Sequence, residues 1–316
     1  MNDFKILFMG TPEFAKISLE YLVNNNFDIA GVITQPDKPV GRKMILTPPP
    51  VKGYALQVDI PVYQPMTLKD ETFFELLKSI NPDIIIVVAY GKMLPKNVLD
   101  YPKYGCVNVH ASLLPKYRGA SPINAAIING EEITGITTMY MAEGCDTGDM
   151  ILKKQTEIGK DETFGELHDK LAHIGGNLLV ETLNQIKNGT AKRVKQPESF
   201  EPLTKKIDND TCEIDWNLSA VEIHNKIRGL SPVYVAFTWL NGKKLKIYKS
   251  ECLGNENEIY KAKNGEVIET DKNIKIKTEN GTVKILELQL EGGKKMTASD
   301  FLNGRKIEKG MVLGEK

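Results

Sequence analysis

Short apolar runs alternate with segments of helical periodicity over the first two hundred residues. The apolar runs predict β-strands at 5–9, 28–34, 84–89, 106–110 and 135–141. The run 84–89 is apolar at every position, which is typical of a strand buried on both faces. Apolar residues recur at helical spacing from Phe14 to Leu22, and we expect Thr11 as the N-cap and Pro12 as the first helical residue. Strands alternating with helices predict an α/β domain with a doubly wound, mostly parallel sheet.

A longer helix is predicted after Thr163, which can form a capping box with Glu166. An apolar stripe follows at helical spacing, and Gly189 is a candidate for the end of this helix. Residues 192–206 are polar and contain two prolines, which is typical of a linker. We therefore expect a first domain over residues 1–190 and a linker over residues 191–208.

The pattern changes near residue 209. After one helical stretch at 220–229, short alternating segments predict strands at 236–240, 245–248, 266–270, 274–278 and 283–288. Asn-Gly pairs lie between several of them and predict tight turns. Residues 209–316 are therefore expected to form a small C-terminal β-barrel domain, of the open type found in oligonucleotide-binding (OB) folds.

Composition excludes several classes of protein. The 316 residues carry no net charge, so binding to nucleic acid would need a local basic surface. Four cysteines without a CxxC pair indicate neither a zinc site nor a disulfide framework, and they fit a reducing compartment. The N-terminus has no signal-like segment, and no apolar run reaches membrane-spanning length. We expect a cytoplasmic protein.

The residues best suited to chemistry follow the predicted strands. Asn108 and His110 lie two apart near the end of a strand, so their side chains point to the same face. An amide can hold a developing oxyanion, and an imidazole can manage the proton of an attacking amine. Asp146 lies in a loop bracketed by glycines and could orient the imidazole. From these residues alone, His110 could equally be a buried packing residue and Asp146 a loop cap.

A resemblance to a known family favours catalytic roles for these residues over structural ones. The block from Asn108 to Pro122, NVHASLLPKYRGASP, resembles the signature of folate-dependent formyltransferases, and Asp146 to Asp149, DTGD, resembles that family's second motif. The resemblance implies the formyltransferase fold, 10-formyltetrahydrofolate as the formyl donor and no metal. By this resemblance the catalytic residues are Asn108, His110 and Asp146. It also implies folate contacts in two further segments: Ser112, Leu113, Leu114 and Pro115, with a pterin pocket at 87–94.

Two further segments resemble family members that formylate methionine attached to initiator tRNA. They are Met9 to Ala15, MGTPEFA, and Thr34 to Lys43, TQPDKPVGRK. The second implies an inserted loop that approaches the tRNA acceptor stem, where positive charge would come from Lys38, Arg42, Lys43 and Lys52. The resemblance further implies that residues 209–316 bind tRNA and that the acceptor is the α-amino group of methionyl-tRNA. Without the resemblance, a basic loop rich in proline is more often merely solvated. We expect a monomer without a membrane partner.

Two positions depart from the family pattern, and three other functions stay open. Residues 231–236, SPVYVA, replace an Asn-Pro-Trp-Pro-Gly-Ala segment, and Tyr117 replaces a commoner Trp. The first departure puts the packing of the second domain there in question. The alternatives are a formyltransferase acting on a small amine such as a sugar nucleotide, a folate hydrolase, and a non-catalytic RNA-binding module.

Overall fold

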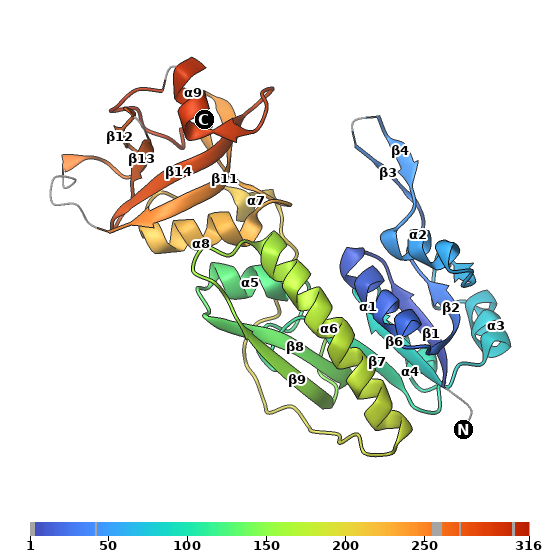
Figure 1. Cartoon of the computed structure of the whole chain (residues 1–316). Coiled ribbons are helices and arrows are strands. Elements are labelled where there is room, and N and C mark those ends of the chain that lie inside the picture. The colour runs from blue at the N-terminus through green and yellow to red at the C-terminus, as the bar shows by residue number, and fades with distance from the viewer. Residues whose placement is uncertain (1–3, 42, 255–260, 272, 305–306, 316) are drawn as a thin grey trace. The chain divides into compact units, whose positions relative to one another are not determined.

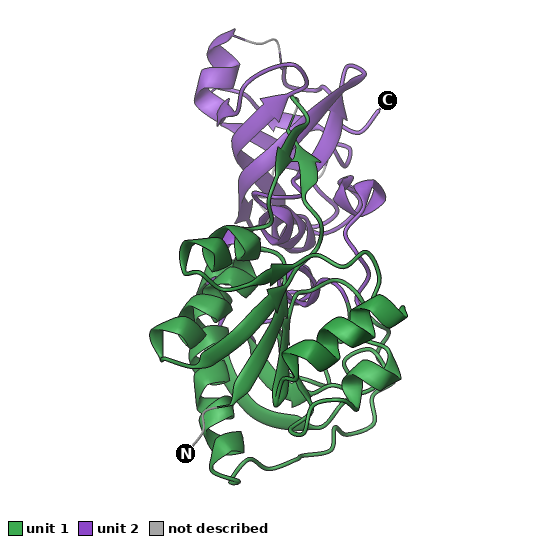
Figure 2. Cartoon of the chain, turned by 90° about the vertical axis from the view of Figure 1, so that its right-hand side faces the viewer, with its two compact units in different colours: residues 1–119, 134–156, 168–203 green, residues 120–133, 157–167, 204–316 purple. Residues whose placement is uncertain are grey.

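The computed structural model describes residues 4–41, 43–254, 261–271, 273–304 and 307–315 (Figure 1). The chain divides into two compact units (Figure 2). Unit 1 comprises residues 1–119, 134–156 and 168–203, and unit 2 comprises residues 120–133, 157–167 and 204–316. The domain boundaries expected from the sequence stay a prediction. Among the described residues, no helix is long and apolar enough to cross a membrane.

The central element of unit 1 is a seven-stranded sheet. Its strand order is β5 (Val62–Tyr63), β2 (Asp28–Ile33), β1 (Lys5–Gly10), β6 (Ile84–Val88), β7 (Cys106–His110), β8 (Ile133–Tyr140) and β9 (Met150–Glu157). The first five strands pair in parallel, and β8 runs antiparallel to β7. Every residue of β6 is buried, as its continuous apolar run predicted. The expected α/β class with a mostly parallel sheet is confirmed.

The helices of unit 1 were predicted in part, because the sequence marked only the first and the last of them. They are α1 (Glu13–Asn24), α2 (Pro50–Gln57), α3 (Glu71–Ile80), α4 (Lys96–Leu99) and α6 (Phe164–Lys187). The Thr163–Glu166 capping box forms at the start of α6, and Gly189 follows its end with a positive φ of 69°. The predicted start of α1 was wrong, because Pro12 is the N-cap and the Thr11 hydroxyl donates to the Tyr90 carbonyl instead.

Helix α6 packs closely against α1. A Cβ on Gly176 would lie 2.4 Å from the Tyr21 ring, so only glycine allows this approach. The neighbouring Gly175 faces Val109 of β7, with 3.1 Å between a Cβ there and the valine methyl. The helix therefore supports the strand that carries Asn108 and His110.

A two-stranded hairpin, β3 (Lys38–Val40) and β4 (Ile45–Thr47), projects from unit 1 above α2 (Figure 1). The sequence predicted a non-helical loop here but not the strand pairing. The hairpin turns through Gly41 and Met44, both with positive φ. All its described residues are exposed, including four large apolar side chains: Val40, Met44, Ile45 and Leu46.

Unit 2 is built on an antiparallel sheet. Its strands are β10 (Ala236–Leu240), β11 (Lys243–Leu253), β12 (Val267–Glu269), β13 (Ile274–Lys277), β14 (Thr282–Leu290) and β15 (Met296–Thr297). Its helices are α5 (Pro122–Ile128), α7 (Asn209–Cys212), α8 (Ala220–Leu230) and α9 (Ala298–Gly304). Register shifts in the β11–β14 pair mark bulges, which bend a sheet. The expected small C-terminal β domain is confirmed as a curled half-barrel.

The segment that departs from the family pattern follows α8 directly. The Ser231 amide donates to Ile227 and so satisfies the last turn of this helix. The Ser231 carbonyl accepts from the Gly165 amide, and the Tyr234 ring packs edge-on against Phe164, with 6.0 Å between ring centroids. Val233, which stands in place of the family's tryptophan, is exposed, so the contacts of this segment within unit 2 come from Ser231 and Tyr234 instead.

Candidate active site

The site lies where β7 ends. Strand β7 is flanked by β6 and β8, so its carboxyl end is at the centre of this edge of the sheet. Asn108 pairs with Met139 and His110 with Thr137 across the antiparallel ladder. Because side chains alternate along a strand, the amide and the imidazole face the same side. The Asn108 side chain is half-buried and His110 is 6% exposed.

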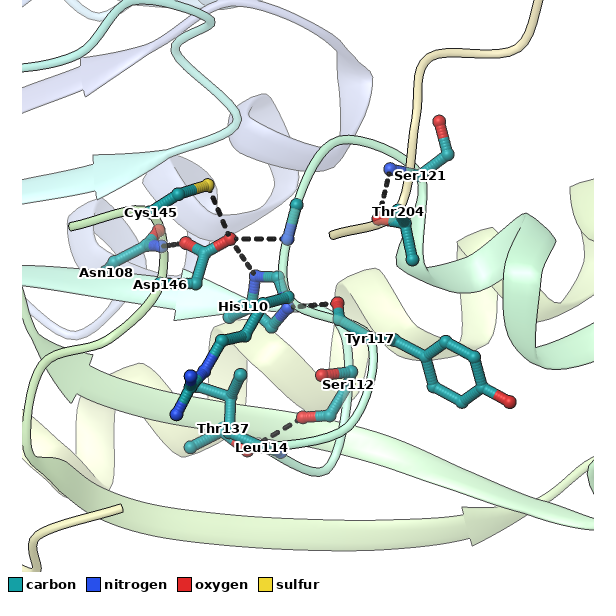
Figure 3. Close-up of polar contacts among 12 residues, drawn as sticks. Asn108, His110, Ser112, Leu114, Tyr117, Ser121, Thr137, Cys145, Asp146 and Thr204 are labelled. Carbon is teal, nitrogen blue, oxygen red and sulfur yellow. Dashed lines mark hydrogen bonds and ion pairs between the residues drawn. The ribbon is translucent and has the colours of Figure 1, made fainter. Parts of the chain in front are cut away.

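Asp146 reaches both β7 residues from the loop between β8 and β9 (Figure 3). Its Oδ1 accepts a hydrogen bond from the Asn108 amide at 3.4 Å, and its Oδ2 lies 3.6 Å from His110 Nδ1. Oδ2 also accepts from the Gly119 backbone amide at 2.8 Å. The structure therefore brings together the three side chains that the sequence singled out.

The backbone around the site is strained at two positions. Asp146 has φ +52° and Tyr117 has φ +58°. Such left-handed conformations cost non-glycine residues of order 1–3 kcal/mol and persist only where the surroundings hold them. Here they direct the Asp146 carboxylate toward His110 Nδ1 and the Tyr117 carbonyl toward the other ring nitrogen.

The hydrogen bond to Tyr117 fixes the tautomer of His110. Nε2 lies 3.0 Å from the Tyr117 carbonyl oxygen, and a carbonyl can only accept, so Nε2 carries a hydrogen. The nitrogen left for proton exchange is Nδ1, beside Asp146. The site thus offers an amide donor, a ring nitrogen that can take or give a proton, and a carboxylate to stabilise the protonated ring.

Cys145 is not arranged as a nucleophile. Burial first, and then the neighbouring Asp146 charge, raise the pKa of the Cys145 thiol to about 11. The thiol donates to Asp146 Oδ2 at 3.6 Å. It is therefore protonated at neutral pH and is a poor nucleophile.

The stretch Ser112 to Pro115 is held mainly by side chains of β8 and β9. The Ser112 hydroxyl donates to the Lys116 carbonyl at 2.6 Å. The buried Thr137 hydroxyl donates to the Ser112 carbonyl at 2.7 Å and accepts from the Leu114 amide at 3.2 Å, and Lys153 donates to the Leu114 carbonyl. No local pattern points to Thr137, because its role depends on a contact between segments that are distant in the sequence.

The four residues predicted to contact folate differ in how far their side chains are buried. Ser112 and Leu114 are buried, whereas Leu113 and Pro115 are half-buried and can reach a ligand. The predicted pterin segment 87–94 comprises the end of β6, the neighbour of β7, and the turn after it, where Ala89 and Gly91 are exposed with positive φ.

The predicted basic loop is only partly available for tRNA. Lys38 and Lys43 are exposed on the hairpin, while Arg42 lies outside the described residues. The expectation that Lys52 adds free positive charge was wrong. Its ammonium group donates to both carboxylate oxygens of Asp37, at 2.9 and 2.8 Å, and to Gln64. These hydrogen bonds, from Lys52 first and then Gln64, hold the pKa of Asp37 below its usual value.

Comparison with known proteins agrees with this architecture and site. The family model described as formyl transferase matches residues 4–183, and the one described as formyl transferase, C-terminal domain, matches residues 206–306. The fold and site thus define a formyl transferase. Two curated relatives named methionyl-tRNA formyltransferase are 49% identical (Alkaliphilus oremlandii) and 46% identical (Acetivibrio thermocellus), each covering 98% of this chain and 100% of the relative. The chain therefore belongs to the formyl transferase family, among its methionyl-tRNA formyltransferases.

Solved structures show the same fold at low identity. An N-formyltransferase from Helicobacter canadensis, in complex with folinic acid and dTDP-3-aminofucose, superposes with a TM-score of 0.68. It is 22% identical, with 93% of this chain and 100% of that chain covered. The sugar 3N-formyl transferase WlaRD, with 5-N-formyl-THF, gives 0.67 at 22% identity, covering 90% and 97%. At this identity the likeness extends to the fold alone.

Proposed function

We propose that this enzyme transfers the formyl group of 10-formyltetrahydrofolate to the α-amino group of methionyl-initiator tRNA. The product is N-formylmethionyl-tRNA, which serves translation initiation. The observation that carries this proposal is the meeting of Asn108, His110 and Asp146 at the end of β7. The acceptor follows from relatives named methionyl-tRNA formyltransferase that align over nearly the whole chain.

The site supports direct attack by the methionine amine on the formyl carbon. As the new C–N bond forms, the Asn108 amide donates to the developing oxyanion. His110 Nδ1 takes the proton that the amine loses, and Asp146 stabilises the charged ring. When the bond between the formyl carbon and folate N10 breaks, a proton returns to N10. The proton lost by the amine is thus matched by the proton gained at N10. No covalent enzyme intermediate is required.

The donor is proposed to lie along two segments next to the site. Half-buried Leu113 and Pro115 and exposed Ala89 and Gly91 support this placement, together with the folate compounds bound by the structural neighbours. Among the described residues, no group of three or more His, Cys, Asp or Glu side chains could hold a metal ion.

The hairpin is proposed to contact tRNA phosphates through Lys38 and Lys43, and Arg42 is included from its position in the sequence. The exposure of the two lysines supports this role. Residues 209–316 are proposed to bind tRNA as well. We further propose that the enzyme acts in the cytoplasm, in keeping with its four free cysteines. We also propose that it is a monomer.

The test is a transfer assay with purified protein and labelled 10-formyltetrahydrofolate. The acceptors compared are methionyl-tRNA, uncharged tRNA, free methionine and a dTDP-amino sugar. Label should pass to methionyl-tRNA alone. Transfer to the amino sugar would instead favour the small-amine alternative, formate release without an acceptor would favour a hydrolase, and tRNA binding without transfer would favour a non-catalytic module.

A further inference from the structure

Gln196 follows α6 in the polar segment that the sequence marked as a linker, yet it is 8% exposed while Lys195 and Pro197 beside it are exposed. We propose that Gln196 is a positioning residue for Asp146, which it holds in place for formyl transfer. This inference rests on the proposed role of Asp146.

The hydrogen bonds of the Gln196 amide account for its whole donor and acceptor capacity. Nε2 donates to the Asp146 carbonyl and to the Gly148 carbonyl, both at 2.8 Å. Oε1 accepts from Arg118 Nε at 3.0 Å and from Nη2 at 2.6 Å. Two carbonyls can only accept and a guanidinium can only donate, so the orientation of the amide is determined by its partners.

These contacts join the two chain segments that define the position of the Asp146 carboxylate. Arg118 precedes Gly119, whose backbone amide donates to Asp146 Oδ2. On the other side, Gln196 holds the backbone of the Asp146 loop itself. A residue in the left-handed region needs such support, because its own backbone preference opposes the conformation.

Gln196 can act as a fixed support because its segment is bonded to β9 within unit 1. Val194 and Met150 exchange two backbone hydrogen bonds, at 2.8 and 2.9 Å. The Arg193 guanidinium lies 3.8 Å from the centre of the Tyr140 ring. The loop that carries Asp146 is therefore held from a segment fifty residues away in the sequence.

The sharpest variant is Gln196→Glu, which keeps the shape and the acceptor oxygen facing Arg118 but removes the two donors facing the carbonyls. We expect kcat to fall roughly tenfold to a hundredfold, as for other small displacements of a catalytic group. The KM values for folate and for methionyl-tRNA should stay within about threefold, because the hairpin and Ser112–Pro115 are untouched. Gln155→Glu, the same change on an exposed position of β9, is the matched control.

A double-mutant cycle separates positioning from a purely structural role. If Gln196 acts through Asp146, then Gln196→Glu should add almost nothing to the loss of kcat caused by Asp146→Asn. If the double variant loses kcat by the product of the two single losses, the proposal is overturned. Full turnover of folded Gln196→Glu would also overturn it. If the charge prevents folding, Gln196→Met, of similar volume and without donors, takes its place under the same criteria. Full activity of Asp146→Asn would instead refute the proposed role of Asp146 itself.

Discussion

The imidazole of His110 is held with one nitrogen on a carbonyl and the other beside a carboxylate. Nε2 is committed to Tyr117, so only Nδ1 can exchange a proton with the substrate amine. The carbonyl is in place because Tyr117 adopts a left-handed backbone, and Asp146 is in place for the same reason. A catalytic group restricted to one tautomer does not have to reorganise during the reaction, which lowers the barrier.

Replacement of Asn108 tests the oxyanion donor. Asn108→Ala should cost on the order of 3 kcal/mol in the transition state, which is a loss of about a hundredfold or more in kcat. Folate binding, measured by fluorescence titration, should be nearly unchanged because the donor is needed only as negative charge develops. Full turnover of the variant would exclude this role.

At the scale of elements, the hairpin β3–β4 is anchored at its base by a polar network. Asp37, Lys52 and Gln64 bond to one another, and the Gln64 amide also donates to the Gln35 carbonyl at 2.8 Å. The Gln35 amide in turn donates to the Tyr90 carbonyl at 3.1 Å, beyond the end of β6. The network therefore connects the exposed hairpin to the same edge of the sheet that carries the site.

Loss of this network should raise the KM for methionyl-tRNA and leave the KM for folate unchanged. Lys52→Met removes the centre of the network, and we expect the KM for methionyl-tRNA to rise about tenfold, equivalent to roughly 1.4 kcal/mol. Lys78→Met, at an exposed ion pair on α3, is the control for the loss of one positive charge. Steady-state kinetics with each substrate varied in turn distinguish the two effects. An equal rise for folate would mean that the network supports the sheet rather than the hairpin.

Helix α8 carries a buried histidine beside a cavity of about 220 Å³ within unit 2. The His224 imidazole bonds to Ser250 through Nδ1 at 3.0 Å, and its Nε2 lies 3.2 Å from Asp161 Oδ1. Burial lowers the pKa of His224; Asp161 opposes that shift, while Arg228 adds to it. The buried ring is thus favoured in its neutral form.

This arrangement predicts a loss of stability in mild acid. Below about pH 6.5 the unfolded chain takes up a proton on His224 more readily than the folded chain does. The free energy of unfolding should therefore fall as the pH drops from about 7.5 to 5.5, and His224→Gln should make that decline shallower. Denaturant titrations at several pH values measure it, with His173→Gln, at an exposed histidine, as control. An unchanged slope in His224→Gln would contradict the prediction.

At the scale of the whole molecule, the periodicity of the chain predicted five of the seven strands in the sheet of unit 1 and five of the six strands in the antiparallel sheet of unit 2. It did not predict β5, β9 or the pairing of β3 with β4, because these strands are too short or too exposed for a hydrophobic pattern. Nor could it predict that residues 120–133 and 157–167 group with unit 2, since that depends on contacts between distant segments.

The sequence predicted the catalytic side chains of the candidate site but not the residues that support them. The spacing of Asn108 and His110 and the resemblance to formyltransferases identified the side chains, and strand alternation indicated their common face. The Tyr117 carbonyl, Thr137 and Gln196 were missed because each forms a hydrogen bond between a side chain and a backbone carbonyl, and the sequence carries no pattern for such bonds.

The central claim is that the Asn108, His110 and Asp146 cluster performs formyl transfer to methionyl-tRNA. Its most direct test is single-turnover transfer of labelled formyl at saturating substrates, comparing the wild type with Asp146→Asn. We expect the rate to fall by roughly a hundredfold or more while the Kd for methionyl-tRNA stays nearly constant. A wild-type rate in the variant, or a loss of tRNA affinity as large as the loss of rate, would contradict the account.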